Sequence, residues 1–294
     1  MTEELRIGII GTGGIAGSHV SQYKKIPNVR IVGGADIIPG KAEAFFKRWD
    51  IPDAKAFEDY RELLEEDIDA VSICTYNVSH YQPTIDSLAA GKDVMLEKPM
   101  SVTLDESVDM VRAARKAGKI LTIGFQSRFG SAIMKAREIA QSGQLGQIYY
   151  VETGGGRRRG IPGGTFVSKS TAGGGAVLDI GCYSVDTAMY VLGHPKPLTV
   201  SACLSNHFGT SPIYAKRASW GGVDPKKFDV DDFGAAMVRF EGDICLLFKM
   251  SWAMHMDHLG PIMWLGTEGG LKLENGLTLY HDQAELEART ELQL

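Results

Sequence analysis

The stretch at residues 5–16 reads LRIGIIGTGGIA, and it decides the fold of the first half of the chain. Residues 5–10 are an apolar run of strand length, and the glycine-rich segment after them opens a predicted helix. A strand, the pattern G-x-G-x-x-A and a helix, in this order, are typical of a dinucleotide-binding turn. Gly11 would allow the tight turn, Gly13 would let a pyrophosphate approach the backbone, and Ala16 would let the helix pack close to the strand. The predicted cofactor contacts in this turn are Gly11, Thr12, Gly13, Gly14 and Ile15.

An acidic residue follows the second predicted strand, residues 29–35. Asp36 lies twenty residues after Ala16, where a carboxylate would bind the ribose hydroxyls of the cofactor and repel a 2′-phosphate. The sequence therefore favours NAD over NADP, although Lys41 could still reach such a phosphate. Asp36 could also cap the helix that is expected from Pro39.

Short apolar strands and helices continue to alternate through the first half of the chain. This pattern predicts an α/β fold with a parallel, doubly wound sheet. The further strands are expected at residues 70–74, 93–97 and 120–125, and the helices at 83–90 and 104–117.

Composition limits the possible functions. The chain has 294 residues, 44% hydrophobic and 23% charged, which suits one large or two medium domains. The net charge of -5 argues against a nucleic-acid or anionic-membrane partner, and no apolar run is long enough to span a membrane. The acidic N-terminus is no signal peptide, and the cysteines and histidines show no metal-binding spacing. We therefore expect a cytoplasmic protein with reduced cysteines and no metal site.

The segment at residues 93–100, DVMLEKPM, ends a buried strand with Glu97, Lys98 and Pro99. Ligands bind beyond the carboxyl ends of the strands in an open α/β sheet, so Lys98 would point toward the ligand. Pro99 restricts the backbone of Lys98 to an extended conformation. A surface Glu-Lys pair after a strand is the alternative reading.

The loop TYNVSH at residues 75–80 follows another strand of the sheet and would face the same crevice. Thr75, Asn77 and His80 are therefore candidate cofactor contacts. Asn77 could instead cap the next helix, and His80 is a packing or cofactor-contact residue more readily than a catalyst.

A run of three glycines at residues 173–175 opens a predicted helix over 176–192. At about 100° per residue, one face is apolar and a narrow stripe beside it is polar. A solvated face would explain two carboxylates and two phenols in a line, and so would a helix that borders a site. The apolar face holds Leu178, Val185, Met189 and Leu192, and the polar stripe holds Asp179, Tyr183, Asp186 and Tyr190.

Together these segments resemble the Gfo/Idh/MocA oxidoreductases, the glucose-fructose oxidoreductase and inositol dehydrogenase family. The resemblance rests on GTGGIA at 11–16, C-T-x-N-x-x-H at 74–80 and GKDVMLEKP at 91–99. It implies a Rossmann domain over residues 1–125. It further implies a substrate-binding and oligomerisation domain over 126–294, with an open, mostly antiparallel sheet. The family usually continues with a longer C-terminal segment, whereas residues 283–294 read as a short polar tail.

The resemblance also implies the chemistry: a nicotinamide cofactor, and a sugar or cyclic polyol as substrate. Lys98 matches the catalytic lysine of the family, and Tyr183 stands where the family motif G-G-x-x-x-D-x-G-x-H-x-x-D has histidine. In the branch with glucose-fructose oxidoreductase and dihydrodiol dehydrogenase, that tyrosine transfers the proton. A phenol is a weak acid, and a nearby ammonium group would lower its pKa. The family usually has proline in place of Tyr76.

The predicted site follows from these matches. The catalytic residues are Lys98, Tyr183 and Asp179. The cofactor contacts beyond the glycine turn are Asp36, Thr75, Asn77, His80, Glu97, Lys98 and Gln126, and the substrate contacts are Lys98, Arg128, Arg158, Asp179 and Tyr183. Arg128 could equally form a salt bridge at a domain interface.

The predicted function is that of an NAD(P)-dependent oxidoreductase, with NADP less favoured than NAD. It would move a hydride between the cofactor and a hydroxyl-bearing carbon of a sugar or polyol. The alternatives are a redox-assisted glycosidase and a non-catalytic dinucleotide or sugar sensor. Substrate specificity would depend on the loops at 157–169 and 206–228. A homodimer or homotetramer would form through the C-terminal sheet.

Overall fold

The computed structural model describes residues 4–216 and 222–293, which fall into two units. The first unit comprises residues 1–124 and the second residues 125–294. The division lies one residue before the boundary expected from the sequence. Part of the predicted specificity loop 206–228, residues 217–221, lies outside the described residues.

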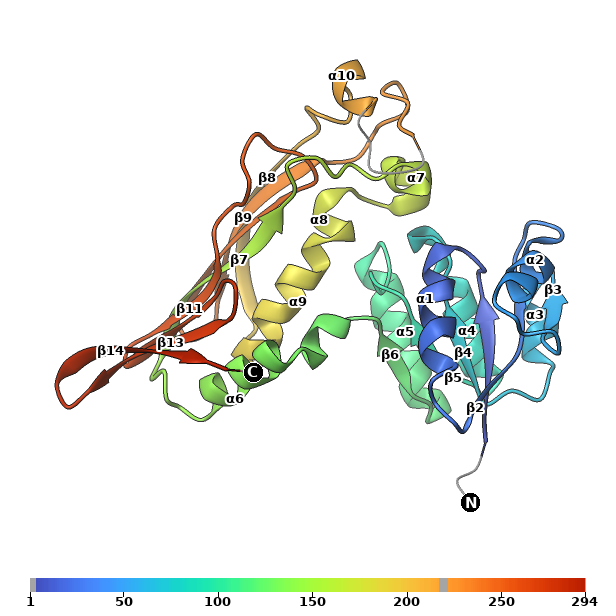
Figure 1. Cartoon of the computed structure of the whole chain (residues 1–294), viewed down its shortest axis with the longest axis horizontal. Helices are drawn as coiled ribbons and strands as arrows, with labels where there is room; N and C mark the ends of the chain where they lie inside the picture. The colour runs from blue at the N-terminus through green and yellow to red at the C-terminus, as the bar shows by residue number, and fades with distance from the viewer. Residues whose placement is uncertain (1–3, 217–221, 294) are drawn as a thin grey trace. The chain divides into compact units, whose positions relative to one another are not determined.

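The first unit is built on a six-stranded parallel sheet (Figure 1). Its strand order is β3-β2-β1-β4-β5-β6, so the order reverses between β1 and β4. The strands are β1 (Leu5–Ile10), β2 (Val29–Ala35), β3 (Lys55–Phe57), β4 (Ala70–Ile73), β5 (Asp93–Leu96) and β6 (Leu121–Ile123). The doubly wound parallel sheet predicted from the sequence is confirmed.

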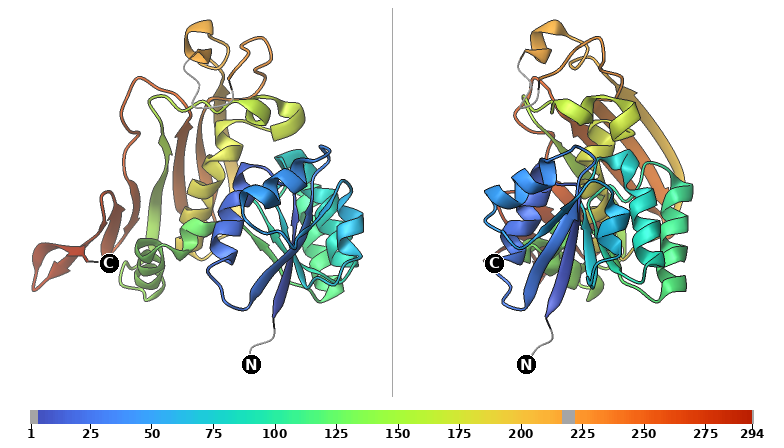
Figure 2. Two further views of the ribbon diagram at one scale, coloured as in Figure 1. Left: turned by 45° about the vertical axis from the view of Figure 1, so that its right-hand side comes forward. Right: turned by 90° about the vertical axis from the view of Figure 1, so that its right-hand side faces the viewer.

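Helices cover both faces of this sheet, and Figure 2 shows the strands between the two helical layers. One core joins Ile7 and Ile9 of the sheet to Val20 and Phe45 of the first two helices. A second core on the opposite face includes Met110. The helices are α1 (Gly14–Tyr23), α2 (Lys41–Arg48), α3 (Tyr60–Leu64), α4 (Tyr81–Ala89) and α5 (Leu104–Ala117), with a short 3₁₀ helix η1 (Asn77–Ser79).

Local sequence signals at both ends of α5 explain why this helix has the predicted bounds. The hydroxyl of Thr103 accepts a hydrogen bond from the N–H of Glu106 at 3.3 Å, which satisfies one unpaired donor of the first turn. Gly118 ends the helix with a φ of 63°, a left-handed conformation that glycine adopts without strain.

An ion pair joins the first strand of this unit to the loop before β4. Arg6 donates to the carboxylate of Asp69 through Nε at 3.0 Å and Nη2 at 2.7 Å. These hydrogen bonds lower the pKa of Asp69 to about 2 from its ordinary value of 3.8. The folded state therefore binds this proton less tightly than the unfolded chain does.

We expect Asp69 to make stability depend on pH in the acid range. Its contribution to the free energy of unfolding is complete above about pH 4 and disappears as the pH falls toward about 2. In Asp69→Asn, urea unfolding should therefore depend less on pH over that range. The difference should shrink at high salt, because both side chains are partly exposed. If the free energy of unfolding depends on pH in the same way in both proteins, Asp69 is not the group responsible.

The second unit contains an eight-stranded sheet in the order β14-β13-β12-β11-β7-β10-β9-β8. Only β10 and β7 pair in parallel, so the predicted open, mostly antiparallel sheet is confirmed. Trp252 and Trp264 are fully buried in the core of this unit. The strands are β7 (Ile148–Gly156), β8 (Pro197–Ser205), β9 (Phe233–Phe240), β10 (Ile244–Ser251), β11 (Ile262–Gly266), β12 (Gly269–Leu273), β13 (Leu277–Gln283) and β14 (Leu286–Leu292).

The helices of the second unit include α8 and α9, which lie along one face of the sheet (Figure 1). The predicted helix over residues 176–192 is divided between them at Ile180. Its helices are η2 (Gln126–Phe129), α6 (Ser131–Gln141), η3 (Gly164–Val167), α7 (Lys169–Ala172), α8 (Ala176–Asp179), α9 (Gly181–Leu192) and α10 (Pro212–Ala215).

Two details of the second unit correct the sequence analysis. The expected apolar face of the 176–192 helix is buried only in part, because Met189 and Leu192 pack against the core whereas Val185 is 39% exposed. Ala188 and Val191, which were not assigned to that face, are fully buried. Residues 283–294 are also no irregular tail, since residues 286–292 form β14 and pair with β13.

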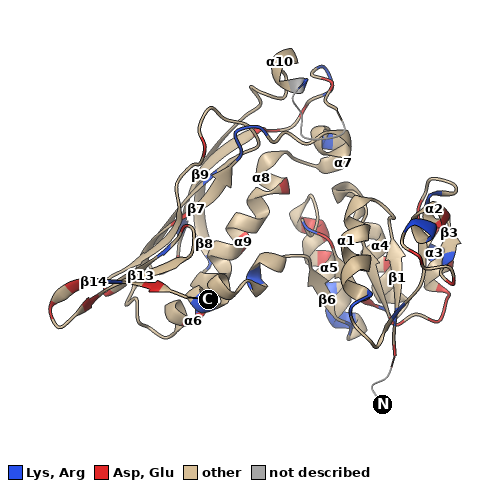
Figure 3. Cartoon of the chain, in the orientation of Figure 1, with Lys and Arg blue, Asp and Glu red and all other residues tan. Residues whose placement is uncertain are grey.

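Neither a membrane-spanning helix nor a metal cluster is found among the described residues. No helix there combines the length and apolarity that a bilayer crossing requires. No group of three or more His, Cys, Asp or Glu side chains in the same residues could hold a metal ion. Basic and acidic residues are interspersed over both units (Figure 3).

Candidate active site

The glycine turn at the end of β1 lies where the strand order of the first unit reverses. Gly11 has a φ of 87°, and a Cβ there would lie 2.9 Å from the backbone of Cys74 and Thr75, so only glycine fits. A Cβ on Gly13 or Gly14, in contrast, would meet no protein atom within 4 Å. The turn therefore leaves open space in front of the first N–H groups of α1, which suits a bound pyrophosphate.

Asp36 lies at the end of β2 beside this turn and is 7% exposed. Its Oδ2 accepts hydrogen bonds from the N–H and hydroxyl of Thr12 at 2.9 and 3.0 Å, and Lys41 Nζ lies 2.8 Å away. Burial raises the pKa of this carboxyl, but the hydrogen bonds from Lys41, Thr12 and Ile38 outweigh burial and leave the pKa lowered. Asp36 is therefore an anion at neutral pH, and Lys41 is paired with it.

We expect Asp36→Ala to weaken the use of NAD and to improve the use of NADP. A hydrogen bond to a charged group contributes about 1.5–3 kcal/mol, so kcat/KM for NAD should fall roughly tenfold to hundredfold. NADP should gain, because the repelling charge is gone and Lys41 is released. Steady-state kinetics with both cofactors measure the ratio, and Glu43→Ala on α2 is the control. An unchanged NAD/NADP ratio would contradict this role.

The loop at residues 75–80 follows β4, the neighbour of β1 in the sheet. Tyr76 has a φ of -79°, close to the angle that proline imposes. Tyrosine at this position therefore adopts the same backbone conformation that the usual proline would. Thr75 Oγ1 donates to the carbonyl of Ser79 at 3.1 Å, and Asn77 is buried.

His80 is fully buried and lies between two backbone carbonyls. Its Nδ1 is 2.7 Å from the oxygen of Pro99, and its Nε2 is 3.2 Å from that of Thr75. Burial lowers the pKa of His80, and a neutral ring has a single N–H, which we assign to the shorter contact with Pro99. His80 thus links the loop after β4 to the segment after β5, while its predicted contact with the cofactor stays a prediction.

The segment after β5 holds Glu97 in a buried position. Glu97 is 7% exposed, its Oε1 lies 2.7 Å from Nε2 of His19, and its Oε2 accepts from the N–H of Lys98 at 3.2 Å. The alternative of a surface Glu-Lys pair is wrong for Glu97, because its carboxylate is enclosed by α1 and by Gly124 after β6. Lys98 follows directly on the same strand end.

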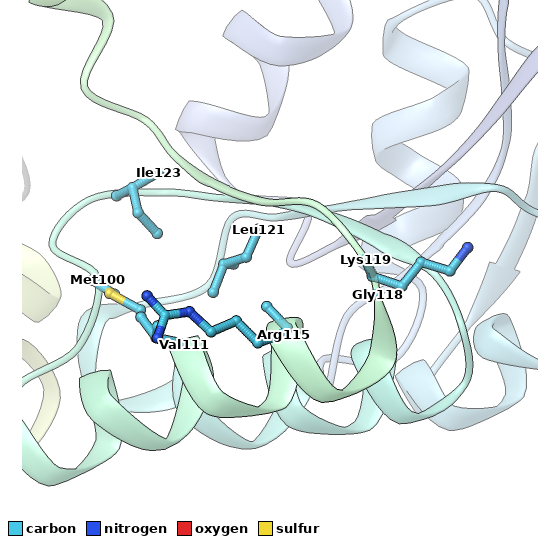
Figure 4. A pocket seen from close by; sticks show the side chains of 8 residues that line it. Met100, Val111, Arg115, Gly118, Lys119, Leu121 and Ile123 are labelled. Carbon is cyan, nitrogen blue, oxygen red and sulfur yellow. The ribbon is translucent and has the colours of Figure 1, made fainter.

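The first unit also has a surface groove of about 360 Å³ between α5 and β6 (Figure 4). Met100, Val111 and Leu121 line it, with Arg115 and Lys119 at the C-terminal end of α5. None of the predicted site residues lines this groove, so it is separate from the nucleotide-binding strand ends.

In the second unit, the acidic segment at residues 228–232 anchors the elements around the predicted substrate residues. Asp231 accepts hydrogen bonds from the N–H groups of Gly175 at 2.8 Å and Val177 at 2.9 Å, and so holds the start of α8. Asp229 holds the start of α7 through the N–H of Lys169 at 2.6 Å. Asp232 accepts from the N–H groups of residues 208 and 209.

Asp179 ends α8 and is 7% exposed. The indole N–H of Trp252, a fully buried side chain after β10, donates to its Oδ2 at 3.2 Å. The carboxylate is thereby held by a rigid partner from the sheet. Such a fixed acceptor is suited to orienting a hydroxyl group.

Tyr183 lies one helical turn beyond Asp179, on α9. Its hydroxyl accepts a hydrogen bond from the side-chain amide of Gln126 at 3.1 Å. The ring of Phe125 packs edge-on against the phenol, with centroids 6.1 Å apart. The hydrogen bond and the ring contact fix the position of the phenol oxygen. Gln126, predicted as a cofactor contact, thus also contacts the predicted base.

The two predicted substrate arginines differ in their surroundings. Arg128 forms a two-pronged ion pair with Asp186 of α9, with Nε 2.8 Å from Oδ2. This pair raises the pKa of Arg128 and joins η2 to α9, so any substrate contact would use its remaining N–H groups. Arg158 is 69% exposed and pairs loosely with Asp257 at 3.6 Å. Both substrate contacts stay predictions.

Comparison with known proteins gives this geometry a context. The sequence model of the oxidoreductase family with the NAD-binding Rossmann fold (GFO/IDH/MocA) matches residues 5–125, and that of the GFO/IDH/MocA C-terminal domain matches residues 133–272. The D-glucoside 3-dehydrogenase of Escherichia coli (strain K12) is 34% identical over 279 residues, which are 92% of this chain and 77% of that protein. The chain belongs to the Gfo/Idh/MocA oxidoreductase family.

Two further proteins show similarity to this member of the Gfo/Idh/MocA family. The scyllo-inositol 2-dehydrogenase (NAD(+)) of Bacillus subtilis (strain 168) is 31% identical over 196 residues, 66% of this chain and 55% of that protein. The structure of GenD2 from gentamicin A biosynthesis, in complex with NAD, has a TM-score of 0.78 at 25% identity, and the match covers 93% of this chain and 73% of that one. The family resemblance inferred from the motifs is confirmed.

Several residues that hold the predicted site residues in place were missed in the sequence. They are His19 behind Glu97, Trp252 behind Asp179, and Asp231 at the start of α8. The partners are separated by 78, 73 and 54 residues. The sequence FDVDD at residues 228–232 also resembles the family, but its function in the fold could not be read from the spacing of its carboxylates.

Proposed function

We propose that this chain is an NAD-dependent dehydrogenase that oxidises a hydroxyl-bearing carbon of a sugar, glycoside or cyclic polyol. The observation that carries the proposal is the arrangement on α8 and α9, where Tyr183 is held by Gln126 and Asp179 by Trp252. A sensor would need no such fixed acceptor beside a phenol. The names of the related dehydrogenases support the class of substrate.

Three residues have the chemical roles in this proposal. Tyr183 removes the proton of the reacting hydroxyl as general base. Lys98 stabilises the developing alkoxide and favours the phenolate. Asp179 accepts a hydrogen bond from a second hydroxyl and so orients the ring. The nicotinamide supplies the acceptor for the hydride, and the protein contributes mainly position.

NAD is the proposed cofactor, with the glycine turn holding its pyrophosphate and Asp36 its adenosine ribose. The open space before Gly13 and the ionised carboxylate of Asp36 support this assignment. Thr75, Asn77, His80, Glu97 and Gln126 remain proposed cofactor contacts, and Arg128 and Arg158 remain proposed substrate contacts.

Reduction of NAD and NADP across a panel of glycosides, aldoses and inositols tests the proposal. Turnover with NAD on at least one member of the panel is the expected result. Protein that binds NADH yet is inactive on the whole panel would overturn the dehydrogenase assignment and favour a sensor. Release of free sugar from a glycoside without net NADH would indicate a redox-assisted glycosidase.

We further propose that the chain forms a homodimer or homotetramer in the cytoplasm. Leu246 and Phe248 of β10 face the helices, so Leu247 points to the opposite face of the sheet, with Met263 and Leu265 of β11. A second copy would cover these apolar side chains. Light scattering of the purified protein tests the assembly, and a monomer would contradict it. The four cysteines are free thiols, which suits a reducing compartment.

A further inference from the structure

A chain of hydrogen bonds runs from α1 to the segment that carries Lys98, entirely within the first unit. Tyr23 Oη lies 2.9 Å from Ser72 Oγ, and Ser72 Oγ lies 2.7 Å from Nδ1 of His19. Nε2 of the same imidazole lies 2.7 Å from Oε1 of Glu97. The His19 and Glu97 side chains are each 10% exposed, so water competes little for these bonds.

The carboxylate of Glu97 sets the direction of one hydrogen bond in this chain. A carboxylate only accepts, so Nε2 of His19 donates to Glu97. Nδ1 of the same ring is bound to the hydroxyl of Ser72, which also contacts the hydroxyl of Tyr23. Burial raises the pKa of Tyr23, which keeps its proton available for donation.

The two oxygens of Glu97 have different partners. Oε1 is bound to His19 on α1, and Oε2 accepts from the backbone N–H of Lys98 at 3.2 Å. On the other side of Lys98, the carbonyl of Pro99 is bound by His80 at 2.7 Å. Two imidazoles therefore hold the residues directly before and after the lysine.

We propose that His19 is a positioning residue that fixes the backbone of Lys98 through Glu97. It connects the helix that starts at the glycine turn to the strand end that carries the lysine. Without His19, Glu97 loses its fixed partner and the N–H of Lys98 loses a fixed acceptor. The inference rests on the proposed role of Lys98, because only then does the position of this backbone affect turnover.

His19→Leu tests the inference in the full-length protein, with His19→Gln as the conservative variant and Ser18→Ala on the exposed side of α1 as the control. His19→Leu should lower kcat by roughly tenfold to hundredfold, the scale on which small displacements of catalytic groups act. The dissociation constant for NADH, measured by fluorescence, should change little. His19→Gln should recover much of kcat, because its amide can donate to Glu97. Full activity in His19→Leu, or equal losses in both variants, would overturn the inference.

A double-mutant cycle separates this inference from the proposed function. If His19 acts through Lys98, His19→Leu should cost little in a Lys98→Met background. If the double variant instead shows the product of the two single losses in kcat, His19 acts elsewhere and the role of Lys98 stands. If Lys98→Met alone leaves turnover unchanged, the proposed function of that lysine fails instead.

Nitrogen NMR of the protein without cofactor gives a readout that is independent of activity and of how well His19→Leu folds. The spectrum should show a proton on Nε2 of His19, and Glu97→Gln should change that signal. An Nε2 without a proton would overturn the assigned hydrogen bond to Glu97.

Discussion

Tyr183→Phe is expected to abolish most of the turnover while leaving NADH binding intact. Phenylalanine keeps the ring that packs against Phe125, so α9 should retain its position. It removes the hydroxyl that accepts from Gln126 and, in the proposed mechanism, takes the substrate proton. General base catalysis contributes about 10²–10⁴-fold, and kcat should fall by a factor in that range.

Tyr190→Phe is the matched control for this substitution. Tyr190 is on the same helix, and its ring lies against the guanidinium groups of Arg128 and Arg137 at 5.2 and 4.2 Å. Loss of its hydroxyl should leave kcat nearly unchanged. Equal kcat values for wild type and Tyr183→Phe would remove Tyr183 from the mechanism.

Tyr183→His tests the direction in which the pH profile of kcat/KM should move. The family motif usually has histidine at this position, so an imidazole should restore part of the activity lost in Tyr183→Phe. The ordinary pKa of histidine is about 6.5 and that of tyrosine about 10. The pH profile of kcat/KM for Tyr183→His should therefore rise at lower pH than that of the wild type. A profile that does not move would show that residue 183 is not the titrating base.

The first unit could be predicted well from the sequence because its signals are local. The strand at residues 5–10 and the helix at 104–117 have the expected bounds, since apolar runs, a glycine turn and the N-cap Thr103 determine them. Gly11 follows β1 and Lys98 follows β5, with β4 between these two strands, so the parallel order of the sheet places both residues at the same edge. Fold and nucleotide-binding turn were therefore accessible without coordinates.

The second unit was harder because its decisive contacts are long-range. The break at Ile180 depends on how α8 is anchored by Asp231, a residue far along the chain. The exposure of Val185 depends on which side of α9 packs against the sheet, and a helical wheel cannot show that. Strand β14 has only modest apolar alternation, so its pairing with β13 was not apparent. Trp252 was unrecognised because an indole in a core strand usually signals packing alone.

Lys98→Met should also cause a large loss of turnover, with a change in the pH profile that Tyr183→Phe cannot produce. Methionine keeps the length of the side chain and removes the charge that, in the proposed mechanism, stabilises the developing alkoxide. Loss of one such electrostatic contact costs about 10²–10³-fold in kcat. In the same proposal the ammonium group favours the phenolate, so the remaining activity should need higher pH.

Lys92→Met is the control, because it removes the same charge at the opposite end of the same strand. Lys92 directly precedes β5, whereas Lys98 follows it. Its ammonium group donates to the carbonyl of Ile68 at 2.9 Å, so its loss should affect stability more than turnover. Lys98→Arg should retain part of the activity, since a guanidinium keeps the charge but not the compact shape. If the residual activity of Lys98→Met has the wild-type pH profile, Lys98 does not influence the ionisation of Tyr183. Lys98 would then act on the alkoxide alone.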